Sequence, residues 1–217
     1  MTDFILSGPA AAAHVVLLAH GAGAPVTSGW METMAEKLGE AGLAVARFNF
    51  SYMAARVETG SRRPPPRAEA LVPEYEAAVA TLGGRLAKGQ TLLIGGKSMG
   101  GRVASLAAQD LYERGRIGGL VCLGYPFHPR GAPQSLRTAH LMRLSCPTLI
   151  VQGARDPFGT REEVAGYGLP AGLRVVWAPD GDHDLKPRRG SGATAAGNMR
   201  AAAEAVAAFA AGLPSAR

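Results

Sequence analysis

The sequence has few cysteines and few charged residues for its length. Only two cysteines occur among 217 residues, Cys122 and Cys146, which excludes a disulfide framework. Each lies in or beside an apolar run (LVCLGY and LSCPTLIV), so we expect both to be buried free thiols. Hydrophobic residues make up 47% and charged residues 18%, a composition that is typical of a folded globular chain and excludes a disordered one.

Long apolar segments are also missing. The chain shows no charged start followed by an apolar signal core, and no apolar run is long enough to cross a bilayer. We therefore expect a cytoplasmic protein with no membrane partner.

Basic residues exceed acidic ones but are not concentrated. The chain has 23 Lys and Arg against 17 Asp and Glu, which gives a net charge of +6. The densest basic groups, such as Arg62-Arg63, are short, and no basic helix, aromatic-basic alternation or zinc-finger spacing accompanies them. We therefore expect no nucleic-acid partner and interpret the charge as a positive rim that favours anionic substrates.

Short apolar runs alternate with helical patterns along the chain. Six runs are typical of strands: 14–19, 43–50, 91–95, 119–125, 148–152 and 173–178. Other segments predict helices, which begin after Ser28, at Thr160, and over 66–88, 99–112 and 193–213. The alternation predicts an α/β fold, a three-layer α/β/α sandwich with a mainly parallel, twisted sheet of about six to seven strands. No repeat or long linker divides the chain, so residues 1–217 are expected to form one domain.

A Gly-x-Ser-x-Gly motif follows the run over 91–95. It reads GKSMG over residues 96–100 and lies between a predicted strand and a predicted helix. In that context it predicts a sharp strand-to-helix turn that lifts the Ser98 hydroxyl above the edge of the sheet. The flanking glycines permit such a turn because a side chain there would collide with neighbouring backbone. The alternative is an ordinary glycine-rich turn with a capping serine.

A serine nucleophile needs a base and an orienting carboxylate, and candidates for both follow Ser98 in the chain, the carboxylate first. Asp156 comes after the strand over 148–152, and His183 after the strand over 173–178. The carboxyl ends of parallel strands meet at one edge, so Ser98, Asp156 and His183 are expected to converge. Asp156 has an alternative role in stabilising its turn. Three further acids lie beside His183 and compete for the orienting role: Asp180, Asp182 and Asp184.

An acidic segment and a glycine-rich segment raise two other possibilities, a metal site and a cofactor site. The Asp-His-Asp cluster around His183 has no second histidine or cysteine at ligand spacing, so we expect no metal. The turn HGAGA over residues 20–24 lacks the features of a phosphate loop or a dinucleotide fingerprint, so we expect no cofactor. That turn instead presents backbone N–H groups, and those of Ala22 and Met99 are predicted to form an oxyanion hole.

The joint pattern resembles the α/β-hydrolase superfamily over nearly the whole chain. More narrowly, it resembles the small, lidless dienelactone-hydrolase-like branch shared with a testis-expressed protein and a subunit of a chromatin acetyltransferase complex. The matching segments are LLAHGAGA, RFNFSYM, SRRPPPR, GGKSMGGR, GYPFHP, VQGARDPFG and GDHDLKP. The resemblance implies hydrolase chemistry at Ser98, Asp156 and His183, with an oxyanion hole at Ala22 and Met99. A serine at position 98 departs from the dienelactone hydrolases proper, which have cysteine there, so their substrate is not implied.

These observations predict a serine hydrolase that cleaves a small ester, thioester or related acyl bond. The alternative is a non-catalytic interaction module with the same fold, which the eukaryotic relatives suggest. The segment over 125–148 is too short for a cap domain, so we expect an open, shallow pocket. Five residues are candidates for contacts with the substrate: Tyr52, Arg62, Arg63, Tyr125 and His128. The two arginines are expected to bind an anionic arm of the substrate.

Overall fold

A seven-stranded sheet forms the centre of the molecule in a computed structural model that describes residues 2–60 and 64–214. The strand order is β1-β3-β2-β4-β5-β6-β7, and all strands are parallel to their neighbours except β1, which pairs with β3 in the antiparallel direction. The strands are Ile5–Ser7 (β1), His14–Ala19 (β2), Ala44–Phe48 (β3), Thr91–Lys97 (β4), Gly119–Leu123 (β5), Thr148–Gly153 (β6) and Leu173–Ala178 (β7). The predicted mainly parallel sheet is confirmed.

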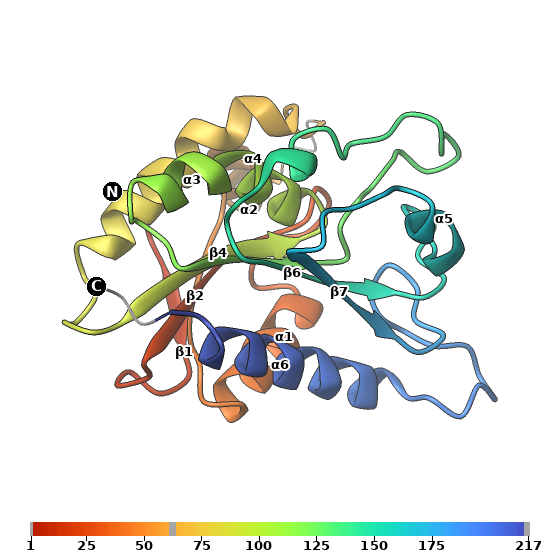
Figure 1. The fold of residues 1–217 in the computed structure, drawn as a ribbon. Helices are drawn as coiled ribbons and strands as arrows, with labels where there is room; N and C mark the ends of the chain where they lie inside the picture. Colours follow the sequence, from red (N-terminus) through yellow and green to blue (C-terminus); the bar gives the residue numbers. More distant parts are fainter. Residues whose placement is uncertain (1, 61–63, 215–217) are drawn as a thin grey trace.

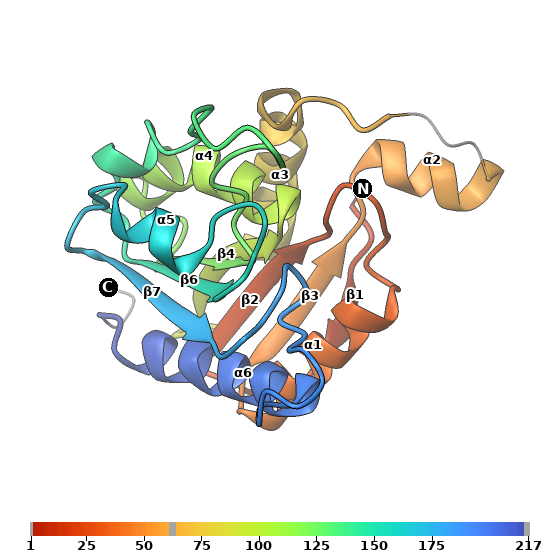
Figure 2. The same ribbon diagram turned by 90° about the vertical axis from the view of Figure 1, so that its right-hand side faces the viewer.

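Helices cover both faces of this sheet (Figure 1). They are Gly29–Glu40 (α1), Ser51–Thr59 (α2), Ala68–Gly83 (α3), Met99–Glu113 (α4), Arg161–Ala165 (α5) and Ala195–Ala211 (α6). The helices α1 and α6 pack together on one face, and α3 and α4 pack together on the other. Figure 2 shows α2 projecting at the side of the molecule beyond the end of β3. The three-layer α/β/α sandwich is therefore confirmed.

Alternating side chains along the strands build two apolar layers. On the central strands, Leu17 and Ile94 join the layer under α3 and α4, whereas Val16 and Leu93 join the layer under α1 and α6. All four side chains are fully buried. Strands covered on both faces must be apolar on both faces, which explains why these runs show little alternation. Both cysteines are buried free thiols, as predicted.

The connection between β5 and β6 leaves the carboxyl edge of the sheet uncovered. It contains one short 3-10 turn, Leu141–Arg143, and no cap domain is present in the described chain. His140, just before this turn, lies with Nε2 2.8 Å from the Ser105 hydroxyl on α4. This contact holds the connection against α4.

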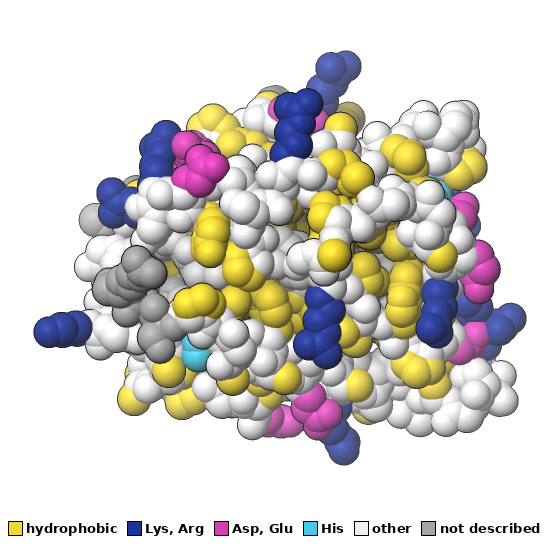
Figure 3. Space-filling view, in the orientation of Figure 1, with side chains coloured by type: hydrophobic (Ala, Val, Ile, Leu, Met, Phe, Trp, Pro, Cys, Tyr) yellow, Lys and Arg dark blue, Asp and Glu magenta, His cyan; other side chains and the backbone are white. Residues whose placement is uncertain are grey.

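Charged side chains are spread over the surface. On the face in Figure 3, the Lys and Arg side chains stand singly or beside Asp and Glu. Ion pairs between residues close in sequence include Lys37 with Glu40 at 2.7 Å in α1, and Arg114 with Asp110 at 2.9 Å at the end of α4. Among the residues that the structure describes, no helix is both long enough and apolar enough to span a membrane.

Candidate active site

Ser98 lies in the tight turn between β4 and α4. Its backbone has φ 51° and ψ −115°, a conformation that non-glycine residues rarely adopt. The glycines on either side permit close contact with the end of β2. A Cβ atom on Gly96 or on Gly100 would lie 2.5 Å from the Ala19 carbonyl oxygen. The Gly-x-Ser-x-Gly spacing is therefore required by backbone packing, which holds the serine hydroxyl at the carboxyl edge of the sheet.

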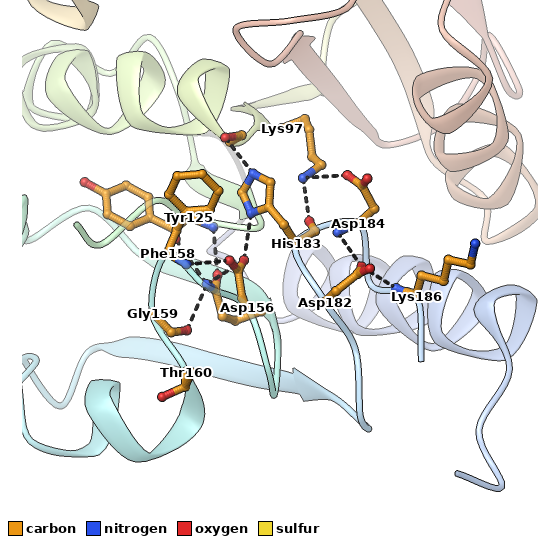
Figure 4. Close-up of polar contacts among 12 residues, drawn as sticks. Lys97, Tyr125, Asp156, Phe158, Gly159, Thr160, Asp182, His183, Asp184 and Lys186 are labelled. Atoms are coloured by element: carbon orange, nitrogen blue, oxygen red, sulfur yellow. Dashed lines mark hydrogen bonds and ion pairs between the residues drawn. The ribbon is translucent and has the colours of Figure 1, made fainter. Parts of the chain in front are cut away.

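Ser98 begins a series of hydrogen bonds that ends at a buried carboxylate (Figure 4). His183 Nε2 lies 2.8 Å from Ser98 Oγ, and His183 Nδ1 lies 2.8 Å from Asp156 Oδ2. The Asp156 side chain is fully buried, whereas the His183 side chain is 21% exposed. When Nδ1 donates to the carboxylate, Nε2 is free to accept the serine proton. The structure thus brings together the three residues that the sequence singled out.

Asp156 is fixed from two sides. Gln152 Nε2 donates to Asp156 Oδ2 at 2.9 Å, and the Phe158 N–H donates to Oδ1 at 2.9 Å. The second contact shows that Asp156 also stabilises its own turn. The Phe158 ring lies against the His183 imidazole, with ring centroids 4.5 Å apart. The contacts of Gln152 and Phe158 with the site were not predicted from the sequence. The signal that could have indicated Gln152 was a polar residue at the end of an apolar strand.

The three competing acids have other partners. Asp180 binds Arg188, and the hydrogen bonds from that residue lower the pKa of Asp180 to about 2. Asp182 Oδ1 accepts the Asp184 N–H at 2.9 Å, and the Asp184 carboxylate lies 3.2 Å from Lys97 Nζ. Asp156 is therefore the carboxylate that reaches the imidazole. In the described part of the chain, no group of three or more His, Cys, Asp or Glu side chains could hold a metal ion.

The turn after β2 lies beside the turn that carries Ser98, which we call the elbow. A buried histidine holds the turn after β2 in place. His20 Nε2 accepts the Phe50 N–H at 3.2 Å, and its Nδ1 lies 2.6 Å from the Gly21 carbonyl oxygen. Burial lowers the pKa of His20 to about 4, so the imidazole is neutral and Nδ1 is the donor. Within the described chain, the N–H groups of Ala22 and Met99 donate no hydrogen bond, so both remain available to an oxygen of a ligand.

A pocket of about 360 Å³ opens beside Ser98 and His183. Its walls come from the turn over 21–24, the start of α1, the elbow and the His183 loop, and include Ser28, Trp30, Met31, Lys97 and Asp184. A larger hollow of about 800 Å³ lies at the opposite edge of the sheet, where β4 and β5 begin. The smaller pocket is the candidate site because Ser98, His183 and the glycine-rich turn that contains Ala22 all line it.

Tyr52 lies against the turn after β2. It is the second residue of α2, and its hydroxyl donates to the Ala22 carbonyl oxygen at 3.2 Å. Burial raises the pKa of Tyr52 to about 12, so the phenol stays protonated and remains a donor. Its contact supports the turn that carries the Ala22 N–H. Arg62 and Arg63 lie outside the described residues.

Tyr125 and His128 do not line the pocket. Tyr125 is fully buried, and its hydroxyl donates to the Arg137 carbonyl oxygen at 2.9 Å. Figure 4 shows its side chain directed away from His183. His128 is also buried, with Nδ1 2.8 Å from the Pro129 carbonyl oxygen. Both belong to the buried packing beyond β5, which corrects the expectation that they contact substrate.

The chain is similar to known hydrolases over most of its length. Residues 12–211 match the model of the alpha/beta hydrolase domain family. Similar solved structures include a dienelactone hydrolase from Anabaena variabilis, 25% identical with a TM-score of 0.67 over 94% of this chain and 88% of that chain. Est1E from Butyrivibrio proteoclasticus is 16% identical with a TM-score of 0.69, over 97% and 99% of the two chains. An α/β serine hydrolase without a lid from Xanthomonas campestris is 19% identical with a TM-score of 0.63, over 85% and 86%. Since the family match spans most of the sequence, this chain belongs to the alpha/beta hydrolase family.

Proposed function

We propose that this protein is a serine hydrolase that cleaves a small ester, thioester or related acyl bond through an acyl-enzyme intermediate. The observation that carries the proposal is the hydrogen-bonded series of Ser98, His183 and Asp156 at a sharp turn above the sheet. The family and its esterase neighbours support hydrolase activity. We further propose that residues 1–217 act as one catalytic domain.

Acylation uses the serine hydroxyl as nucleophile. Ser98 Oγ attacks the acyl carbon while its proton passes to His183 Nε2, and Asp156 stabilises the imidazolium through Nδ1. The carbonyl electron pair moves onto oxygen, where the N–H groups of Ala22 and Met99 stabilise the negative charge. When the carbonyl re-forms, the bond to the leaving group breaks. Nε2 then gives its proton to the departing alcohol or thiol.

Deacylation repeats these steps with water. His183 Nε2 takes a proton from the attacking water, the same backbone groups stabilise the second oxyanion, and the bond to Ser98 Oγ breaks as Oγ regains a proton. The products are the carboxylic acid and the free enzyme. No metal or organic cofactor takes part in these steps.

The pocket favours small acyl groups. Its volume of about 360 Å³ is at the lower end of ligand pockets, and no cap among the described residues encloses it. We propose that substrates with an anionic arm are preferred, because the chain is basic overall. A panel of short esters, thioesters and lactones in matched neutral and acidic pairs tests this. Equal kcat/KM for both members of every pair would remove the anionic preference.

A fluorophosphonate probe tests the enzyme against the non-catalytic module. Such a probe should label the wild type at Ser98, and Ser98→Ala should lose both labelling and at least about 1,000-fold of hydrolysis while remaining folded. Ser105→Ala is the matched control, because Ser105 is buried on α4 and bonded to the Arg102 carbonyl oxygen. Labelling of Ser98→Ala, or hydrolysis within tenfold of the wild type, would overturn the proposal.

A further inference from the structure

Lys97 is a buried charged residue that the steps above do not use. It is the last residue of β4 and directly precedes Ser98 in the chain. Its side chain is only 8% exposed, and burial lowers its pKa, an effect that the nearby carboxylate of Asp184 opposes. A buried ammonium group is costly unless it is hydrogen-bonded and paired, so its partners identify its role.

The partners of Lys97 all belong to the walls of the pocket. Its Nζ donates to the His183 carbonyl oxygen at 2.5 Å and lies 3.2 Å from Asp184 Oδ1. The same ammonium lies 5.1 Å from the centre of the Trp30 ring. Figure 4 shows Lys97 reaching the backbone and side chain of the two consecutive residues 183 and 184. With these contacts made, the Lys97 ammonium has its partners within the protein.

Trp30 holds the same segment from α1. Its Nε1 donates to the Asp184 carbonyl oxygen at 2.9 Å. The backbone oxygens of His183 and Asp184 are therefore each bound by a side chain from a different element, β4 or α1. The loop also makes bonds of its own around Asp182: Oδ1 accepts the N–H groups of Asp184 and Lys186, the Asp182 carbonyl oxygen accepts the Leu185 N–H, and the Asp182 N–H donates to the Lys186 carbonyl oxygen.

We propose that Lys97 is a positioning residue that holds the His183 imidazole between Ser98 and Asp156. Because Lys97 ends β4 and Ser98 follows it directly in the turn, the bond from Lys97 to the His183 carbonyl ties the loop of the base to the strand that leads into the nucleophile. The ion pair with Asp184 and the contact with Trp30 keep the ammonium in the orientation that makes this bond. The inference rests on the proposed function for its effect on turnover, but not for its effect on the geometry of His183.

Lys97→Met tests the proposal, because methionine keeps an unbranched apolar stem against Trp30 and removes the charge and the donors. We expect kcat on a short neutral ester to fall by about tenfold to a hundredfold, as misplacement of a reacting group does, with KM changed by less than about threefold. The low-field proton NMR signal of the His183–Asp156 hydrogen bond, identified by its loss in Asp156→Asn, should broaden or disappear. Lys186→Met is the matched control, because Figure 4 shows that side chain pointing away from the site, and it should change neither readout.

The two readouts separate the possible failures. A folded Lys97→Met with kcat within twofold of the wild type and an intact low-field signal would overturn the proposal. If Lys97→Met does not fold, Asp184→Asn decides: a weakened signal with kcat lowered about threefold supports positioning, and an unchanged signal overturns it. If the wild type is neither labelled nor active, the proposed function fails, and the NMR signal still reports whether Lys97 positions His183.

Discussion

The elbow that carries Ser98 and the loop that carries His183 are built in different ways. The elbow passes from β4 to α4 without an intervening loop, and its shape is set by backbone against backbone, as the contacts of Gly96 and Gly100 with Ala19 show. The Ser98 N–H also donates to the Leu123 carbonyl oxygen of β5 at 2.9 Å, so the serine is placed by backbone contacts with the two adjacent strands. A local sequence motif is therefore enough to encode it.

The His183 loop depends on distant side chains. It belongs to the long segment 179–194 between β7 and α6, where Asp180 and Leu185 have φ of 49° and 63°. Asn198 of α6 donates to the Leu185 carbonyl oxygen at 2.8 Å. Lys97 holds the loop from the opposite side. Besides its own hydrogen bonds around Asp182, the loop is thus held by side chains far apart in sequence. The comparison predicts steric sensitivity at the elbow and polar sensitivity at the loop.

The largest effect is expected at the elbow. Gly96→Ala places a Cβ atom against the backbone of β2 and α4, which cannot move aside, so the free energy of unfolding should fall by at least about 3 kcal/mol. Urea unfolding and ester hydrolysis should both show the loss. Gly83→Ala at the end of α3 is the control, since a Cβ there meets nothing within 4 Å, and its stability should change by less than about 1 kcal/mol. Similar losses for the two variants would contradict the steric explanation.

The second-largest effect is expected at Asp156, the carboxylate that binds the His183 imidazole. Asp156→Asn should lower kcat by about 100-fold to 10,000-fold with the fold retained, because the imidazole loses its orientation and the stabilisation of its charged form. Steady-state hydrolysis of a short ester measures this. Asp180→Asn is the control, because its carboxylate is bound to Arg188, and it should stay within about threefold of the wild type. If the asparagine variant of Asp180, Asp182 or Asp184 lowered kcat more than Asp156→Asn does, the assignment of Asp156 as the orienting carboxylate would be wrong.

A smaller effect is expected from the turn after β2. The folded-state pKa of His20 is about 4 against 6.5 for a free histidine, so the unfolded chain binds a proton first as the pH falls. The free energy of unfolding should therefore have its full value above about pH 6.5 and fall toward pH 4. His20 should account for up to about 3 kcal/mol of this loss. His140, with a pKa of about 4, acts in the same direction. Urea unfolding at pH 7, 5.5 and 4.5 measures the slope, which should be flatter in His20→Gln, and a flat wild-type profile would refute it.

Much of the fold could be predicted because the central strands are covered on both faces. The bounds predicted for β2 and β7 match the structure, as does the start of α4 at Met99. The strand β1 was missed because it has three residues and leaves Leu6 68% exposed. The helix α2 was missed because Met53 is its one buried residue, so it has no apolar stripe to detect.

The site was predicted where a motif or a strand end marks it. Ser98, Asp156 and His183 each follow an apolar run, and the structure brings them together. Lys97 and Trp30 were not recognised, because their partners lie 86 and 154 residues away in the sequence and no local pattern links them. The narrower likeness to the testis-expressed type of domain stays a prediction.

The uncovered carboxyl edge has a kinetic consequence. Because the β5–β6 connection forms no cap and the His183 side chain is 21% exposed, bulk water could reach the acyl group that the proposed mechanism places on Ser98 without any prior opening motion. The acyl group therefore meets water far more often than any dissolved alcohol, and release as the free acid should outrun transfer to another acceptor. For the same reason the rate should rise smoothly with substrate concentration, with no jump when the substrate gathers into micelles, since the described part of the chain has no lid for an interface to displace.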